Sequence, residues 1–174
     1  MYANWGVAES VLVTDKAAIY TVGGEETSVI ALDKHTGNLL WKSKSLGGTR
    51  AYASPSIIEK NGQKMILAQT ANDLIALNPD NGEIIWNFNL VPFHPGSMGK
   101  GANTNTPLFY NNEIFLTSGY DHPALMLSLA EDGKSVSLKW KNDTLDCHFG
   151  GAVMLNGKIY STNWKSNSTG NCVS

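Results

Sequence analysis

Short runs of apolar and β-branched residues alternate with turn residues along the whole chain, and these runs fall into groups of four. The first group reads as the strands Glu9–Val13, Ala17–Val22, Ser28–Leu32 and Asn38–Lys42. Gly, Asn, Asp and Ser separate the runs, which is typical of antiparallel hairpins. No segment keeps a 3.6-residue apolar period between capping residues, so the pattern predicts a chain with almost no helix.

The same grouping returns further along the chain. The second group comprises Pro55–Glu59, Lys64–Gln69, Leu74–Leu77 and Glu83–Phe88. The third comprises Thr106–Tyr110, Glu113–Thr117, Leu125–Leu129 and Ser135–Trp140. The fourth comprises Ala152–Leu155, Lys158–Thr162 and Asn171–Val173, and lacks a last strand.

A repeated motif spans the third and fourth strands of these groups. Residues 31–41 read Ala-x-Asp-x-x-Thr-Gly-x-x-x-Trp, and residues 76–86 carry alanine, glycine and tryptophan at the same offsets. A looser copy runs from Ser128 to Trp140, with serine in place of the alanine and a two-residue insertion. Units of about 45 residues with four antiparallel strands predict an all-β protein built from β-propeller blades.

The motif looks like the tryptophan-docking motif of propellers of the pyrroloquinoline-quinone (PQQ) type. That family includes quinoprotein alcohol dehydrogenases and the propeller lipoprotein of the outer-membrane barrel-assembly machinery. The resemblance implies that each motif tryptophan packs on the alanine-bearing strand and glycine turn of a neighbouring blade. The residues expected in this structural role are Ala31, Gly37, Trp41, Ala76, Gly82, Trp86 and, with the looser motif, Trp140.

The resemblance also implies a ring of seven or eight blades, about twice what the chain contains. We therefore expect residues 1–174 to form a partial PQQ-like propeller of about three and a half blades, with the remaining blades as their partners. The expected blade bounds are 7–44, 51–90, 102–143 and an incomplete 147–174.

The loops differ between the two faces expected of such an arc. Turns between the first and second strands, and between the third and fourth, are short, whereas the other loops are longer and rich in side chains. Long loops on one face of a rigid scaffold usually carry binding sites. The longer set includes Gly23–Glu26, Ser118–Pro123, Asn163–Gly170 and the blade connection Asn87–Thr104.

The long-loop face also receives the residues that begin the innermost strands, around the mouth of the central channel. Polar groups that converge on a concave surface predict a ligand site, with Tyr120 and His122 at its rim. The alternative is that these side chains bind channel water or cap strand ends. The candidate ligand-binding residues are Glu9, Arg50, Tyr52, Asn103, Asn105, Tyr120, His122 and His148.

Metal and cofactor chemistry finds little support in the sequence. His94, His122 and His148 lack the close spacing of a zinc site, so we predict no metal. The quinoprotein dehydrogenases have adjacent cysteines against the cofactor, but Cys147 and Cys172 are far apart. We expect no cofactor in this stretch, PQQ and calcium remain candidates for a full-length protein, and no catalytic residue can be named.

Composition removes two classes of partner. The chain has 13 Lys and Arg against 15 Asp and Glu, so it lacks the basic excess of a nucleic-acid-binding protein. No apolar run approaches the length of a membrane-spanning helix.

Two functions remain open. The first is a binding or scaffolding propeller in the periplasm or outside the cell, exported by a signal that this stretch lacks. Its partner at the propeller face would be a small molecule, a sugar or a protein. The second is part of a quinoprotein-like oxidoreductase that acts on an alcohol or sugar.

Overall fold

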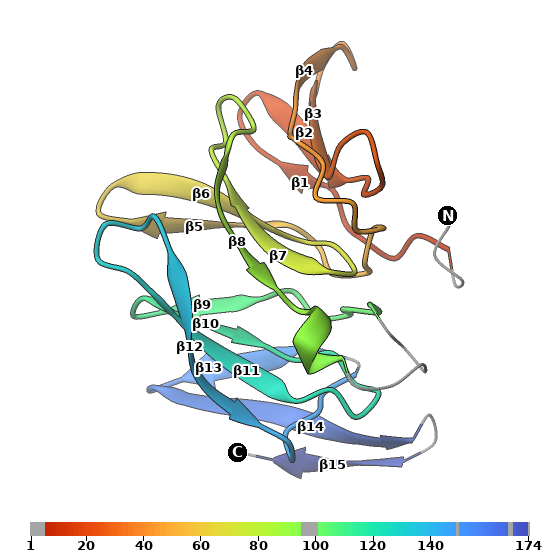
Figure 1. Cartoon of the computed structure of the whole chain (residues 1–174), viewed down its shortest axis with the longest axis vertical. Coiled ribbons are helices and arrows are strands. Elements are labelled where there is room, and N and C mark those ends of the chain that lie inside the picture. Colours follow the sequence, from red (N-terminus) through yellow and green to blue (C-terminus); the bar gives the residue numbers. More distant parts are fainter. Residues whose placement is uncertain (1–5, 95–100, 149, 167–168, 174) are drawn as a thin grey trace.

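The chain folds into an arc of antiparallel β-sheets arranged one after another (Figure 1). This computed structural model describes residues 6–94, 101–148, 150–166 and 169–173, following 164–166 and 169–173 by their backbone. Three sheets have four strands and the fourth has three. These are about three and a half blades of a β-propeller, as predicted. Within the described residues the one helical turn is the 3-10 segment η1 (Val91–Phe93).

Each blade takes its strands in chain order. The first contains β1 (Leu12–Val13), β2 (Ala17–Thr21), β3 (Val29–Asp33) and β4 (Leu39–Lys42). The second contains β5 (Ser56–Lys60), β6 (Gln63–Gln69), β7 (Asp73–Leu77) and β8 (Ile84–Asn89). The third contains β9 (Leu108–Tyr110), β10 (Glu113–Leu116), β11 (Ala124–Leu129) and β12 (Val136–Asn142). The fourth contains β13 (Ala152–Leu155), β14 (Lys158–Ser166) and β15 (Thr169–Val173).

Two sequence predictions need correction. The segment predicted as the loop Asn163–Gly170 is mostly strand, because β14 continues to Ser166 and β15 begins at Thr169; residues 167–168 lie outside the described residues. In the third blade the residue opposite Trp140 is Met126, not Ser128. The β11–β12 hairpin is longer than its counterparts, which shifts the register.

Another prediction is covered only in part. Of the connection Asn87–Thr104, residues 95–100 lie outside the described residues. In Figure 1 the short β5–β6, β9–β10 and β13–β14 turns lie on the left.

Burial follows from each blade's position in the arc. In β2 the buried residues alternate with half-buried ones, because one face of the first blade is covered by the second. In β7 all five residues are buried, because this strand lies between two neighbours. Three apolar clusters fill the boundaries between consecutive blades.

The motif tryptophans connect one blade to the next. Trp41 Nε1 donates a hydrogen bond to the Pro79 carbonyl oxygen at 3.0 Å, and Trp86 Nε1 donates to the Gly133 carbonyl oxygen at 3.1 Å. Both indoles are buried. A Cβ on Gly82 would lie 2.4 Å from Trp41 Cε3, so only glycine leaves room for the ring. Trp140, with its looser motif, is half-buried against Phe115 of its own blade.

In the first blade, the aspartate of the motif builds the turn that corresponds to the one contacted by Trp41 in the second blade. The Asp33 carboxylate accepts hydrogen bonds from the backbone N–H groups of His35 and Thr36 and from the Thr36 hydroxyl. These bonds lower the pKa of Asp33. Gly37, with φ of +74°, closes the turn by donating its N–H to the Asp33 carbonyl oxygen.

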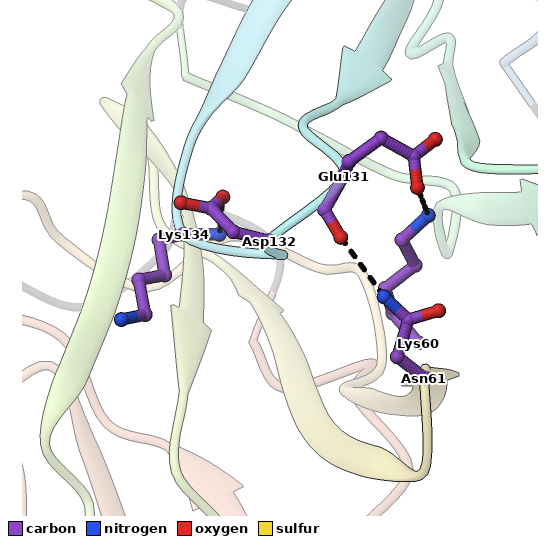
Figure 2. A network of polar contacts seen from close by, with 5 residues as sticks. All are labelled: Lys60, Asn61, Glu131, Asp132 and Lys134. Atoms are coloured by element: carbon purple, nitrogen blue, oxygen red, sulfur yellow. Dashed lines mark hydrogen bonds and ion pairs between the residues drawn. The ribbon is translucent and has the colours of Figure 1, made fainter.

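A polar contact also joins the second and third blades on the short-turn side (Figure 2). Lys60 is 7% exposed, and its Nζ lies 2.8 Å from Glu131 Oε2. Asn61 Nδ2 donates to the Glu131 carbonyl oxygen at 2.9 Å. A buried ammonium requires such a partner, so this contact helps to set how the two turns meet.

Replacing Trp86 tests the tryptophan contact between blades. We expect Trp86→Ala to lower the free energy of unfolding by about 3–5 kcal/mol, because it empties a buried aromatic site. Trp86→Phe should cost less, because it keeps most of the ring and removes only the bond to Gly133. Urea denaturation measures both; a loss below about 1 kcal/mol for Trp86→Ala would contradict the assignment.

Two glycines offer a matched test of the ring contact itself. Gly82 and Gly37 have almost the same φ, +73° and +74°, but a Cβ on Gly37 would have no atom within 4 Å. Alanine therefore strains the backbone equally at both positions, and only Gly82→Ala overlaps the Trp41 ring. We expect Gly82→Ala to destabilise the protein by about 1–3 kcal/mol more than Gly37→Ala in thermal melts. Equal losses would show that the ring contact contributes nothing.

Candidate functional site

A cavity of about 600 Å³ lies where four consecutive blades begin their innermost strands. That volume is within the usual range for small-molecule sites. Four of the eight predicted ligand-binding residues line it: Tyr52, Asn105, Tyr120 and His148. The other lining residues are Ala8, Ser54, Ala102, Thr104, Thr106 and Gly150.

Backbone hydrogen bonds between blades fix the position of Tyr52. The N–H groups of Tyr52 and Ala53 both donate to the Asn103 carbonyl oxygen, at 2.9 and 3.0 Å. The start of the second blade is therefore tied to the start of the third, and the Tyr52 ring is held at the cavity.

The side chains of Asn103 and Asn105 cap backbone groups. Asn103 Nδ2 donates to the Thr70 carbonyl oxygen at 2.8 Å. Asn105 Nδ2 donates to the Cys147 carbonyl oxygen at 2.6 Å, and its Oδ1 accepts the Gly151 N–H at 3.1 Å. Both amides therefore cap backbone groups, which is the alternative considered above for polar residues at the channel mouth, although Asn105 also lines the cavity.

Tyr120 and His148 form an aromatic wall. Their rings meet edge to face, with centroids 4.3 Å apart at 62°. A Cβ on Gly119 would lie 2.5 Å from His148 Cβ, so a glycine is needed where this loop passes the histidine. Burial lowers the pKa of His148 and raises the pKa of Tyr120, with Tyr52 adding to the latter. Both shifts favour the neutral side chain, so the wall is uncharged at neutral pH.

The structure places His122 beneath the loop instead of at the cavity rim. It is 2% exposed, and its Nδ1 lies 3.0 Å from Ser118 Oγ. Its ring lies against His94, with centroids 4.3 Å apart. Desolvation, and then the charge of His94, lowers the pKa of His122 to about 4. It lines a separate hollow of about 10 Å³, large enough for one water molecule at most.

Glu9 and Arg50 do not line the cavity. Glu9 precedes the innermost strand of the first blade, and Arg50 lies in the connection to the second blade, where it forms a β-bridge with Thr70. Glu9 Oε1 accepts the Thr21 N–H at 2.7 Å, and Arg50 Nη1 donates to the Tyr20 hydroxyl at 3.0 Å. Desolvation raises the pKa of Glu9 to about 7, against the opposing effects of the Thr21 bonds and the Arg50 charge.

Two residues that support the wall are not among the predicted ligand-binding residues. Thr104 Oγ1 donates to the carbonyl oxygens of Ser118 and His148, at 3.0 and 2.8 Å. The Asp146 carboxylate lies behind the Tyr120 loop and accepts the Asp121 N–H at 2.8 Å. The sequence feature that could have pointed to Asp146 is its place in a blade connection, two residues before His148.

The cavity does not fit the cofactors considered from the sequence. PQQ is a tricarboxylate, and the residues that line the cavity include no Lys or Arg. Calcium needs six to eight oxygen ligands with carboxylates among them, and the lining includes no Asp or Glu. Across the described ranges, no group of three or more His, Cys, Asp or Glu is placed to hold a metal ion. The described residues also contain no helix long and apolar enough to cross a membrane.

Comparison with known proteins identifies the relatives of this chain. The family model described as outer membrane protein assembly factor BamB matches residues 4–169. A quinoprotein ethanol dehydrogenase of Pseudomonas aeruginosa is 33% identical over 105 residues, which cover 51% of this chain and 16% of that enzyme. The blades, the repeated motif and a family match over nearly the whole length lead to one conclusion: this chain belongs to the PQQ-like repeat family of β-propellers.

Proposed function

We propose that this chain is a ligand-binding part of a PQQ-like β-propeller and that its cavity takes an uncharged small molecule of the sugar class. The observation that carries the proposal is the cavity of about 600 Å³ with Tyr52, Tyr120 and His148 in its lining. The propeller supplies a rigid frame, and the site residues come from blade connections and loops on one face.

The chemistry of the lining favours a neutral ligand with both polar and apolar faces. Aromatic rings offer flat surfaces for the C–H faces of a sugar ring. Ser54, Thr104 and Thr106 add small polar side chains around them. An anionic ligand would lose hydration on entering the cavity, and the lining contains no cation to offset that free-energy cost.

We also propose that the protein acts in the periplasm or outside the cell. The description of its family as an outer membrane protein assembly factor supports this location. A protein partner on the same face would compete with the sugar for the cavity, so a competition experiment distinguishes the two.

A second candidate function is part of a quinoprotein-like oxidoreductase. The relationship to a quinoprotein ethanol dehydrogenase favours it. The uncharged lining argues against PQQ in this cavity, and we expect no PQQ-dependent dye reduction by this chain with alcohols or sugars.

The ligand class is tested by titrating the protein with neutral monosaccharides and disaccharides, and separately with PQQ plus calcium, by calorimetry. We expect saturable binding of at least one saccharide and none of PQQ. Tyr52→Ala should weaken saccharide binding about tenfold through loss of an aromatic face. Tyr110→Ala is the control, because Tyr110 lies on β9 outside the cavity and is 44% exposed. PQQ binding at micromolar concentration, with no saccharide binding, would favour the oxidoreductase.

A further inference from the structure

The loop that carries Tyr120 has an unusual backbone. Between β10 and β11, Tyr120 and Asp121 have φ of +62° and +60°, the left-handed region that residues other than glycine rarely adopt. The pair forms the centre of a tight turn closed by the His122 N–H, which donates to the Gly119 carbonyl oxygen at 3.2 Å. A bulky aromatic residue such as Tyr120 is an outlier at positive φ, and backbone strain of this kind concentrates at ligand sites.

Asp146 is the group that holds this loop from outside. Its Oδ2 accepts the Asp121 N–H at 2.8 Å. The Asp146 backbone N–H donates to Asn163 Oδ1 of β14 at 2.6 Å. One carboxylate, anchored to the fourth blade, therefore holds the residue that follows Tyr120 by a direct hydrogen bond.

We propose that Asp146 is the positioning residue of the cavity: it fixes the Tyr120 loop so that the Tyr120 ring stands edge-on to His148 and completes the aromatic wall. The effect on ligand binding rests on the proposed function. The effect on the loop does not, because the hydrogen bonds and the ring contact exist without a ligand.

The surroundings of Asp146 do not favour its negative charge. The residue is 6% exposed, and its Oδ1 is buried without a hydrogen-bond partner. Desolvation is the largest effect that raises its pKa, to about 6, and the Asp121 carboxylate adds to it; the N–H groups of Asp121 and Gly119 act in the opposite direction. The ion pairs of the described residues include none at Asp146.

The direction of this pKa shift distinguishes a role of Asp146 in positioning the loop from a role in stabilising the fold. The pKa of Asp146 in the folded protein lies above the ordinary 3.8 of the unfolded chain. Ionisation therefore disfavours the folded state, and this contribution to stability is lost as the pH rises through about 6. The charge strengthens the hydrogen bond from the Asp121 N–H, so the loop is held most firmly above pH 6, where the charge costs most stability. A carboxylate with a purely structural role would instead stabilise the folded state when it is ionised.

The decisive variant is Asp146→Asn at pH 7.5, compared with Asp143→Asn, an exposed carboxylate 3.1 Å from Lys141 Nζ. We expect Asp146→Asn to melt at the same temperature as the wild type or higher. The Asp121 amide should exchange about tenfold faster, the loss expected for a charge-assisted bond, and the Tyr120 ring resonances should move. Saccharide affinity should fall, while Asp143→Asn should leave all four measurements unchanged.

A pH titration of the wild type gives a readout that does not depend on any variant folding. The Asp121 amide resonance should show a step with a midpoint near pH 6 that disappears in Asp146→Asn. Unchanged loop exchange and Tyr120 resonances in that variant, or no step at the Asp121 amide, would overturn the proposal. If the loop responds as expected while no saccharide binds, the positioning role stands and the proposed function falls.

Discussion

The contact between a tryptophan on the outer strand of one blade and the turn of the next sets the geometry of this protein. An indole such as that of Trp41 must reach both the Pro79 carbonyl oxygen and the space left by Gly82, so two rigid sheets can meet in only one relative placement. The apolar clusters fill the remaining boundary but are less directional. The tryptophan contacts at the outer strands therefore also fix where the innermost strands begin. The cavity lies between the beginnings of these strands.

The fold could be predicted because its determinants are local. Alternating apolar runs, hairpin turns and the Ala-x-Asp-x-x-Thr-Gly-x-x-x-Trp string all lie within one blade. Most strands formed within the predicted runs, although β1 comprises only Leu12–Val13 of the predicted Glu9–Val13. The errors arose where register depends on more than composition. The β11–β12 hairpin is longer than its counterparts, so Met126 instead of Ser128 faces Trp140. The polar stretch after Asn163 resembles a loop by composition, but most of it pairs as β14 and β15.

The site could be predicted only to the level of a face of the propeller. Topology brings Tyr52, Tyr120 and His148 together, because each belongs to a loop or connection on the same side. Topology does not reveal which polar side chains already form hydrogen bonds with backbone groups. Asn103 bonds to the carbonyl oxygen of Thr70 in another blade, and no local pattern announces such a contact. Asp146 was missed for the same reason, since its importance lies in bonds to residues more than twenty positions away.

Within each blade, the residues that hold neighbouring blades together and the residues that shape the cavity lie at different ends. Residues that hold blades together, such as Trp86 and Lys60, lie toward the outer strands and short turns. Residues that shape the cavity lie at the opposite end, in loops and blade connections. Substitutions in the cavity can therefore change ligand chemistry without disturbing the frame, which explains how one repeat architecture serves proteins with different activities. In this chain, the uncharged aromatic wall, with the buried Asp146 carboxylate behind it, favours a neutral ligand, whereas a tricarboxylate cofactor would need cations that the lining lacks.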